Sequence, residues 1–242
     1  MSETEKNFSE QQPEGVSELS KTIARLIAHL KEDKKNIDYI KPEMLPDIDL
    51  YMDQVTTFMD THLVSSKRYD DDKILTKTMI NNYAKNNLLP PPEKKKYSKD
   101  HLFLLTFIYY FKNMLSMSDI QCLLEPIKDN FFQRTVNGVT LEDIYSEVFS
   151  AEEGIREDII EDIMEKYDVS RKSFGGSDTE GVSAVSKSSA LDGKSISQKP
   201  MLQDFAFVCM LCYDIFLKKQ VVEKIIDEIA NDKILAEKKK HK

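Results

Sequence analysis

Two apolar runs constrain the fold of this 242-residue chain more than any other feature of its sequence. They are HLFLLTFIYYF at 101–111 and FAFVCMLCYDIFL at 205–217. Each run is well short of the roughly 20 apolar residues that a helix needs to cross a bilayer, and each contains polar residues. We therefore expect both runs to form buried helices in a protein that does not enter a membrane.

The composition predicts an all-α fold. Seven glycines and eight prolines are few for this length, whereas helix-forming Leu, Lys and Glu are abundant. Three cysteines without framework spacing indicate a reducing compartment. The polar segment MSETEKNFSEQQPEG has no apolar stretch of the kind that a signal peptide carries. We expect a cytoplasmic protein.

Apolar stripes, prolines and Ser/Gly-rich sequence divide the chain into six segments. The first helix should begin at Ser17, with Ile23, Leu26, Ile27 and Leu30 on one stripe. The predicted segments are a mobile tail at 1–16, an N-terminal helix and connection at 17–45, a helical region at 46–130, acidic amphipathic helices at 131–169, a Ser/Gly-rich flexible loop at 170–200, and a C-terminal helix at 201–242 that packs on the core or on a dimer partner.

The most acidic part of the chain extends from Leu141 to Asp168. It contains eleven Asp and Glu residues against Arg156 and Lys166. Apolar residues recur at helical spacing, which predicts a pair of amphipathic helices with a solvated acidic face. The apolar stripe comprises Leu141, Ile144, Tyr145, Val148, Ile155, Ile159 and Ile163. We do not predict a divalent-cation site here, because the spacing and central glycine of an EF-hand are missing.

Positive charge gathers in one stretch, LTKTMINNYAKNNLLPPPEKKKYSKDHL at 75–102. Residues 73–100 contain seven lysines against Glu93 and Asp100, although the whole chain has a net charge of −8. A basic segment on an acidic protein predicts a surface that meets an anionic partner such as nucleic acid. The alternative is an ordinary solvated loop, in which the lysines only keep the surface hydrated.

Thr76 should cap a helix in this stretch that ends before the prolines at 90–92. Met79, Ile80, Tyr83 and Ala84 fall on one side of it, and the opposite side has amides and cations but no carboxylate. Asn can read an adenine edge, and Lys can reach phosphates. We expect the base-facing residues to be Thr78, Asn81, Asn82 and Lys85. We expect the phosphate contacts to be Lys77, Lys94, Lys95, Lys96, Tyr97 and Lys99.

The order of these features resembles the DNA-binding half of MerR-type winged helix-turn-helix regulators. The corresponding pieces are Thr76, Tyr83, Leu88-Leu89-Pro90, Tyr97-Ser98, and the helices expected at 102–115 and 116–124. The chain is more similar to an uncharacterised bacterial family, the domain of unknown function 1836 family, through PDIDLYMDQV (46–55), LTKTMINNY (75–83) and KKKYSKDHL (94–102). These likenesses imply that 46–130 is a winged helix-turn-helix with at most a minimal β wing.

The chain also departs from the MerR pattern. Asn81 and Asn82 stand where those regulators carry an Arg and an aromatic residue, and Lys94-Lys95 replaces the Tyr-Arg pair of the wing. Lysine keeps a phosphate contact but loses the bidentate geometry of arginine. Despite these departures, the resemblance implies a bacterial transcriptional regulator that binds double-stranded DNA as a homodimer. The alternative is a helical protein–protein interaction adaptor whose basic patch meets an acidic partner, such as its own 141–168 face.

Other candidate sites are weaker. Cys209 and Cys212 have CxxC spacing inside an apolar run, but structural zinc takes four ligands, so we expect two core cysteines. We expect His101 to be a surface or capping residue, with a phosphate contact as the alternative. The sequence has no nucleotide-binding or hydrolase motif. We therefore expect no enzymatic activity, no metal and no cofactor. We expect the acidic helical remainder to mediate dimerisation, effector sensing or both, and the sequence does not identify an effector.

Overall fold

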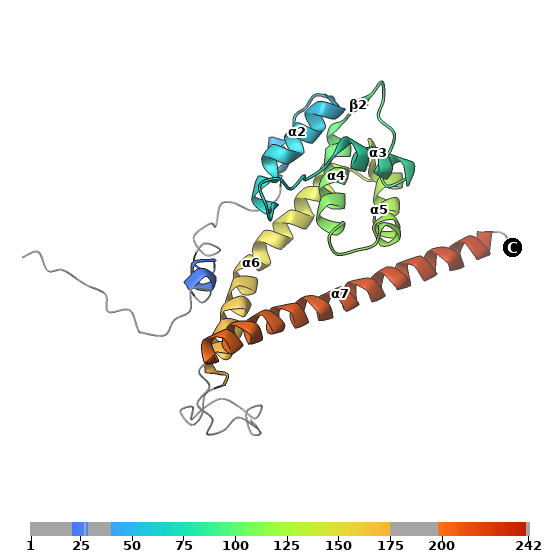
Figure 1. Ribbon diagram of the computed structural model, residues 1–242. Coiled ribbons are helices and arrows are strands. Elements are labelled where there is room, and N and C mark those ends of the chain that lie inside the picture. Colours follow the sequence, from blue (N-terminus) through green and yellow to red (C-terminus); the bar gives the residue numbers. More distant parts are fainter. Residues whose placement is uncertain (1–20, 27, 29–39, 175–197, 241–242) are drawn as a thin grey trace, which may run out of the picture. The chain divides into compact units, whose positions relative to one another are not determined.

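The computed structural model describes residues 21–26, 28, 40–174 and 198–240 (Figure 1). The predicted tail at 1–16, the Ser17 cap and most of the Ser/Gly-rich loop lie outside these residues. The chain divides into two compact units. The larger comprises 35–156 and 215–242, and the smaller comprises 1–34 and 157–214.

The larger unit is mostly helical, as the composition predicts. Its elements are the 3-10 turns η1 (Pro42–Met44) and η2 (Val64–Ser66), the strands β1 (Leu50–Tyr51) and β2 (Lys96–Tyr97), the helices α2 (Met52–His62), α3 (Lys77–Lys85), α4 (Lys99–Phe111) and α5 (Met117–Phe131), and parts of α6 (Leu141–Lys172) and α7 (Lys199–Lys240). The two strands pair antiparallel, with Leu50 opposite Tyr97 and Tyr51 opposite Lys96.

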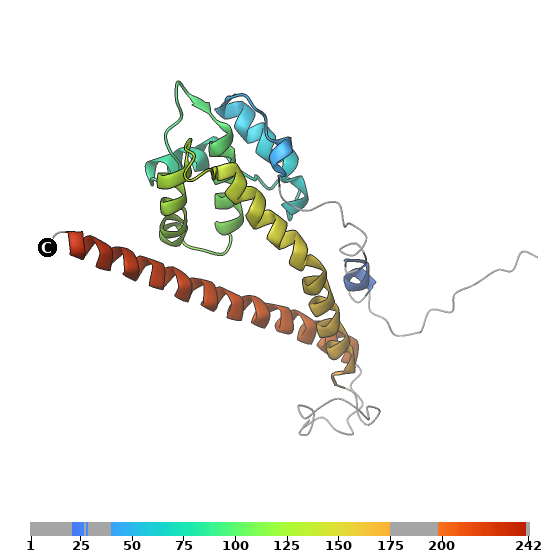
Figure 2. The ribbon, with the colours of Figure 1, turned by 180° about the vertical axis from the view of Figure 1, so that it is seen from behind.

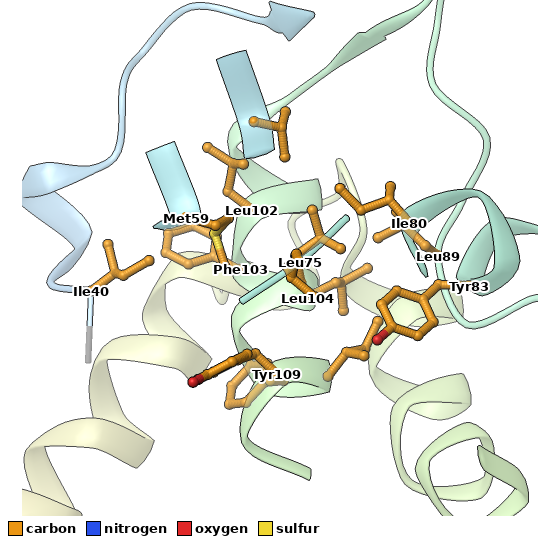
Figure 3. Packing of buried hydrophobic residues seen from close by; sticks show 14 of the residues in the cluster. Ile40, Met59, Leu75, Ile80, Tyr83, Leu89, Leu102, Phe103, Leu104 and Tyr109 are labelled. Atoms are coloured by element: carbon orange, nitrogen blue, oxygen red, sulfur yellow. The ribbon is translucent and has the colours of Figure 1, made fainter. Parts of the chain in front are cut away.

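Helix α4 is the centre of the core, which confirms the prediction for the first apolar run. Every residue from His101 to Tyr109 is buried. Figure 3 shows Met59 of α2, and Ile80 and Tyr83 of α3, among the side chains packed around α4. Full burial of one such side chain contributes about 1.5–3 kcal/mol, so the helices around α4 are firmly held in place.

Helix α6 corrects the prediction of two acidic helices. Residues Leu141–Lys172 form one unbroken helix (Figures 1 and 2), because Gly154 continues the helical backbone and no residue caps a break. Its first turns join the core through Tyr145, whose hydroxyl donates to the carbonyl of Ile40 at 2.6 Å. The predicted stripe is wrong further along, where Ile155 and Ile159 are exposed.

The smaller unit joins the end of α6 to the start of α7. Arg171 forms an ion pair with Asp204, which is only 2% exposed. The side-chain amide of Gln203 donates to the carbonyls of Arg171 and Ser173 at 2.6 and 3.0 Å. Tyr167 meets Phe207 edge to face. These contacts hold the end of α6 against the start of α7. In the N-terminal segment, Ile23 is buried, but Leu26 is 58% exposed and departs from the predicted stripe.

The second apolar run corrects another expectation. Within 205–217 only Phe207 is buried, and both Cys209 and Cys212 are exposed free thiols instead of core cysteines. The run lies within a helix much longer than itself, because the polar sequence after Leu217 also favours a helix. Residues Lys199–Ile234 are long and apolar enough to cross a membrane, by length and composition alone, and 17% of the most apolar window is buried.

Candidate nucleic-acid interface

Helix α3 has the cap and the inner face that the sequence predicts. The side-chain oxygen of Thr76 accepts a hydrogen bond from the backbone N–H of Met79 at 3.2 Å. Ile80 is fully buried, and Tyr83 is 5% exposed. Burial raises the pKa of the Tyr83 phenol, which therefore stays neutral at physiological pH. These contacts fix which side of α3 faces outward.

The outward side of α3 presents all four residues that we expect to face bases. Thr78, Asn81, Asn82 and Lys85 are exposed, and α3 has no acidic residue in its first turn. Lys77, at the edge of this side, forms an ion pair with Asp53 of α2. Both of these side chains are well exposed, so the pair adds little stability and leaves Lys77 able to exchange partners.

The end of α3 is fixed by a left-handed residue. Asn87 has φ 56°, a conformation that asparagine tolerates better than most residues. The backbone N–H groups of Leu88 and Leu89 then donate to the carbonyl of Tyr83 at 2.9 and 3.3 Å. Lys128 of α5 donates to the Asn87 carbonyl at 2.8 Å. This arrangement stops α3 before the three prolines and directs the chain toward β2.

A tight turn between α3 and β2 carries Lys94 and Lys95, both of which are exposed. The backbone N–H of Lys96 donates to the carbonyl of Glu93 at 2.8 Å. Lys94 and Lys95, between them, both have positive φ, which is the pattern of a type I′ hairpin turn. Within the described part of the chain, neither of these lysines nor Lys85 has an ion-pair partner. We call α3 together with Glu93–Lys96 the basic face.

Two residues assigned to phosphate contacts do not fit that role. Tyr97 is 3% exposed, because its place in β2 turns the ring into the core. Lys99 pairs with Glu142 at 3.0 Å and with Asp47 at 3.4 Å. These partners raise the pKa of Lys99 despite the opposing effect of burial, so its charge serves the fold. Sequence reasoning missed both contacts because they join residues far apart in the chain.

Lys96 has a partner that the sequence analysis did not identify. Its ammonium lies 5.3 Å from the centre of the Tyr51 ring, across the β1–β2 pair. Tyr51 itself is 53% exposed. Alternation along a two-residue strand is too short a signal to predict this pairing. An exposed aromatic ring beside the lysine turn adds a surface on which a sugar or base could pack.

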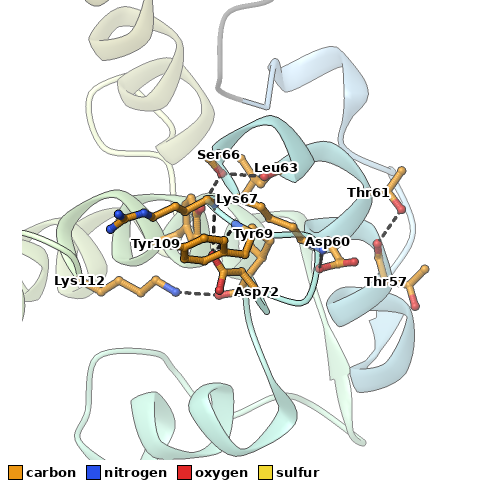
Figure 4. A network of polar contacts seen from close by, with 12 residues as sticks. Thr57, Asp60, Thr61, Leu63, Ser66, Lys67, Tyr69, Asp72, Tyr109 and Lys112 are labelled. Atoms are coloured by element: carbon orange, nitrogen blue, oxygen red, sulfur yellow. Dashed lines mark hydrogen bonds and ion pairs between the residues drawn. The ribbon is translucent and has the colours of Figure 1, made fainter. Parts of the chain in front are cut away.

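The connection between α2 and α3 is long, but it is held in place (Figure 4). The hydroxyl groups of Ser66 and Tyr109 lie 2.5 Å apart. The carboxylate of Asp72 accepts hydrogen bonds from the backbone N–H groups of Arg68 and Tyr69. Lys112 of α4 donates to the carbonyl of Ile74 at 2.7 Å. Because Ile74 lies just before the Thr76 cap, α4 positions the start of α3. The connection exceeds the three to four residues usual in a helix-turn-helix.

His101 is a buried capping residue and not a surface one. Its Nδ1 accepts a hydrogen bond from the backbone N–H of Ser98 at 3.0 Å, and its ring meets Tyr97 and Phe132 edge to face. Burial lowers the pKa of His101 to about 4. The ring is therefore neutral at physiological pH and is not a cationic phosphate ligand. In the described ranges, no group of three or more His, Cys, Asp and Glu residues could hold a metal ion.

Part of the chain matches the model of a known protein family. Residues 40–148 match the family model described as Domain of unknown function (DUF1836). The match includes α2, α3, α4 and α5 and the first turns of α6, so it contains the basic face and excludes α7. The comparisons with curated proteins and with solved structures found no match. The resemblance to the domain-of-unknown-function family is therefore confirmed over these residues.

Proposed function

We propose that this protein is a bacterial transcriptional regulator that binds double-stranded DNA through the basic face. One observation carries the proposal. The outward side of α3 and the Glu93–Lys96 turn present amides and unpaired lysines, although the whole chain has a net charge of −8. An acidic protein that separates its positive charge in this way attracts a polyanion to one side only.

In this proposal α3 enters the major groove, in a MerR-like winged helix-turn-helix arrangement. Asn81 and Asn82 are placed to form paired hydrogen bonds with adenine edges, and Thr78 contacts neighbouring base edges. Lys85 lies one turn beyond Asn81 on the same side and reaches either a base or a phosphate. The anchored core face of α3, through Ile80 and Tyr83, keeps these side chains from turning inward.

The phosphate contacts of the proposal are Lys77, Lys94 and Lys95, with Lys96 held against Tyr51 beside them. Tyr97 and Lys99 are not among the proposed phosphate contacts, because Tyr97 is buried and Lys99 forms ion pairs with Asp47 and Glu142. Contacts of this kind fix the register of the protein on DNA but do not distinguish sequences. The turn thus takes the place that a wing has in winged helix-turn-helix proteins.

We further propose that the regulator acts in the cytoplasm as a homodimer. Helix-turn-helix proteins commonly bind two half-sites related by a two-fold axis, and a dimer matches that symmetry. A single α3 is only nine residues long, and its buried residues Ile80 and Tyr83 face the core instead of the groove. Two copies would double the number of base and phosphate contacts, and DNA would bind both at once.

The test combines selection of bound genomic fragments with a salt titration. The proposal predicts that the purified protein enriches fragments sharing a sequence, and that the logarithm of affinity falls linearly with the logarithm of salt concentration. With three phosphate lysines per protomer, we expect a slope of about −2.7 per protomer. If no fragment is enriched and binding shows no sequence preference, the protein is better described as a protein–protein interaction adaptor.

A further inference from the structure

Helix α7 carries an apolar stripe that is spaced for another helix. Intervals of three and four residues alternate along it, which is the seven-residue repeat of a two-helix seam. We call this stripe the α7 seam, and its members are Met201, Phe205, Val208, Cys212, Ile215 and Val222. All six are exposed, with 66% of Phe205 and 61% of Ile215 open to solvent.

The same repeat already packs against a helix at its far end. Continuing from Val222 by four residues gives Ile226, which is 3% exposed. There the thiol of Cys122 in α5 approaches the carbonyl of Ile226, and Lys233 donates to the carbonyl of Cys122 at 3.0 Å. This stripe is therefore a helix-packing surface that α5 covers near Ile226. From Val222 back to Met201 its apolar residues are exposed.

The exposed area is large for a monomer. Phe205, Tyr213 and Phe216 are 66%, 62% and 53% exposed. Since an aromatic side chain has about 150–250 Å² of surface, these three alone expose roughly 270–450 Å². That area already matches the largest apolar patch of a typical monomer, about 300–600 Å², before the aliphatic residues are added. Of these three rings, Phe205 lies on the α7 seam and Phe216 beside it, so an interface through the seam removes them and the aliphatic seam residues from water, whereas Tyr213 lies on another side of the helix.

The contacts of α7 favour a helix partner in water over a bilayer. Between Met201 and Leu217, α7 contains two carboxylates, and both face basic residues of α6. Asp204 pairs with the Arg171 guanidinium, and Asp214 lies 4.0 Å from the ammonium of Lys166. Insertion into a bilayer would bury these charges or separate the pairs, at a cost of several kcal/mol for each ion. The opposite, apolar side of α7 is open without any such rearrangement.

We infer that the α7 seam binds the α7 seam of a second copy of this chain. The seam is self-complementary about a two-fold axis, because each helix presents the same repeat to the other. Lys219 interrupts the repeat and pairs with Glu223 on its own helix at 2.8 Å. A single polar position of this kind fixes the register of a helix pair. The inference rests on the homodimer in the proposed function and adds the surface that forms it.

Light scattering on the full chain in detergent-free buffer tests the inference. We expect a mass of twice 28.0 kDa at micromolar concentration. Phe205→Glu with Ile215→Glu places four carboxylates in the dimer seam and should raise the dissociation constant at least 100-fold. The matched control is Leu217→Glu with Val221→Glu, which changes two exposed apolar residues on the other side of α7 and should leave the dimer intact.

A second measurement leaves the seam unaltered. In a Cys122→Ser, Cys209→Ser variant, Cys212 is the remaining thiol, and its alkylation should slow at least 10-fold between dilute and concentrated protein. A rate independent of concentration would overturn the inference. So would a monomeric wild type, an unchanged dimer in the seam variant, or equal dissociation of both variants. Flotation of a monomeric wild type with phosphatidylglycerol vesicles would assign the seam to a membrane instead.

Failure of this inference is distinguishable from failure of the proposed function. A monomer that still selects a DNA sequence, and loses that preference when α3 is changed, would reject the α7 seam and keep the regulator. A dimer that forms through the α7 seam but selects no DNA sequence would keep the α7 seam and reject the regulator. Circular dichroism checks that every variant retains the helix content of the wild type before its mass is interpreted.

Discussion

Lys94 and Lys95 occupy two consecutive left-handed backbone positions, with φ of 48° and 66°, in the turn that leads into β2. A left-handed residue other than glycine or asparagine is disfavoured by roughly 1–2 kcal/mol. Asn-Gly is the usual sequence for such a turn. The chain therefore holds two lysines at its tip in a conformation that asparagine and glycine adopt more easily. We attribute this strained turn to a role in binding, because strained backbone positions are often found at binding sites.

The first prediction separates stability from binding in this turn. Lys94→Asn with Lys95→Gly should raise the free energy of unfolding by about 1–2 kcal/mol, because both new residues accept positive φ. The same variant should bind DNA more weakly, and its salt slope should shrink by about 1.8 per protomer. Urea unfolding and fluorescence anisotropy measure the two effects.

The control for the turn keeps its charge. Lys94→Arg with Lys95→Arg should leave both the unfolding free energy and the salt slope close to wild type. If the Asn-Gly variant binds DNA as tightly as the wild type, the turn makes no phosphate contact. If it is no more stable, the two lysines carry no strain.

The second prediction concerns pH. The folded pKa of His101, about 4, is lower than the 6.5 of an ordinary histidine. The folded state thus favours the neutral ring, and His101 contributes stability that is fully present above pH 6.5. That stability falls as the pH drops toward 4, by on the order of 3 kcal/mol in total.

His101→Gln should remove most of this pH dependence. Glutamine at the same position can still accept the hydrogen bond from the Ser98 N–H, as in an ordinary capping box. Chemical unfolding at pH 7 and at pH 4.5 measures the effect. The wild type should lose more stability between the two values than the variant does. Equal losses in both proteins would mean that His101 does not titrate in this range.

The third prediction tests how α4 positions α3. Lys112→Met removes the donor to the Ile74 carbonyl and leaves that carbonyl without its partner, so we expect a loss of about 1–3 kcal/mol in unfolding free energy. DNA affinity should also fall, because Ile74 leads directly into the cap of α3.

Lys73→Met is the matched control for Lys112. It removes an exposed lysine from the same connection, and it should change stability by less than about 0.5 kcal/mol. The positioning role of Lys112 would be contradicted by a variant that is destabilised but binds DNA with unchanged affinity at temperatures where it remains folded.

Local rules predicted much of the basic face. The cap at Thr76 and the inward side of α3 follow from the residue types and from helical periodicity, and both agree with the structure. The burial of Tyr97 and the ion pairs of Lys99 were not predictable in this way. They depend on β1, Asp47 and Glu142, which are distant in the sequence.

The burial of the two apolar runs was also only partly predictable from the sequence. Both are apolar on nearly every side, so periodicity could not indicate which run other helices cover. The run at 101–111 became the centre of the core, whereas in 205–217 only Phe207 is buried, with its ring against Tyr167 of α6. For α6, no sequence signal showed that the helix continues through Gly154.

The central claim is that α3 reads DNA bases while the neighbouring lysines hold its phosphates. Affinity measurements on a selected site and on variants of that site test it most directly. Asn81→Ala should cost about 1–3 kcal/mol on the preferred sequence and relax the preference at one base pair. Lys95→Ala should weaken every sequence alike and reduce the salt slope by about 1. Asn130→Ala, an exposed asparagine on α5, is the control and should change neither. Identical losses from Asn81→Ala and Lys95→Ala on every sequence, or wild-type binding by both, would contradict the account.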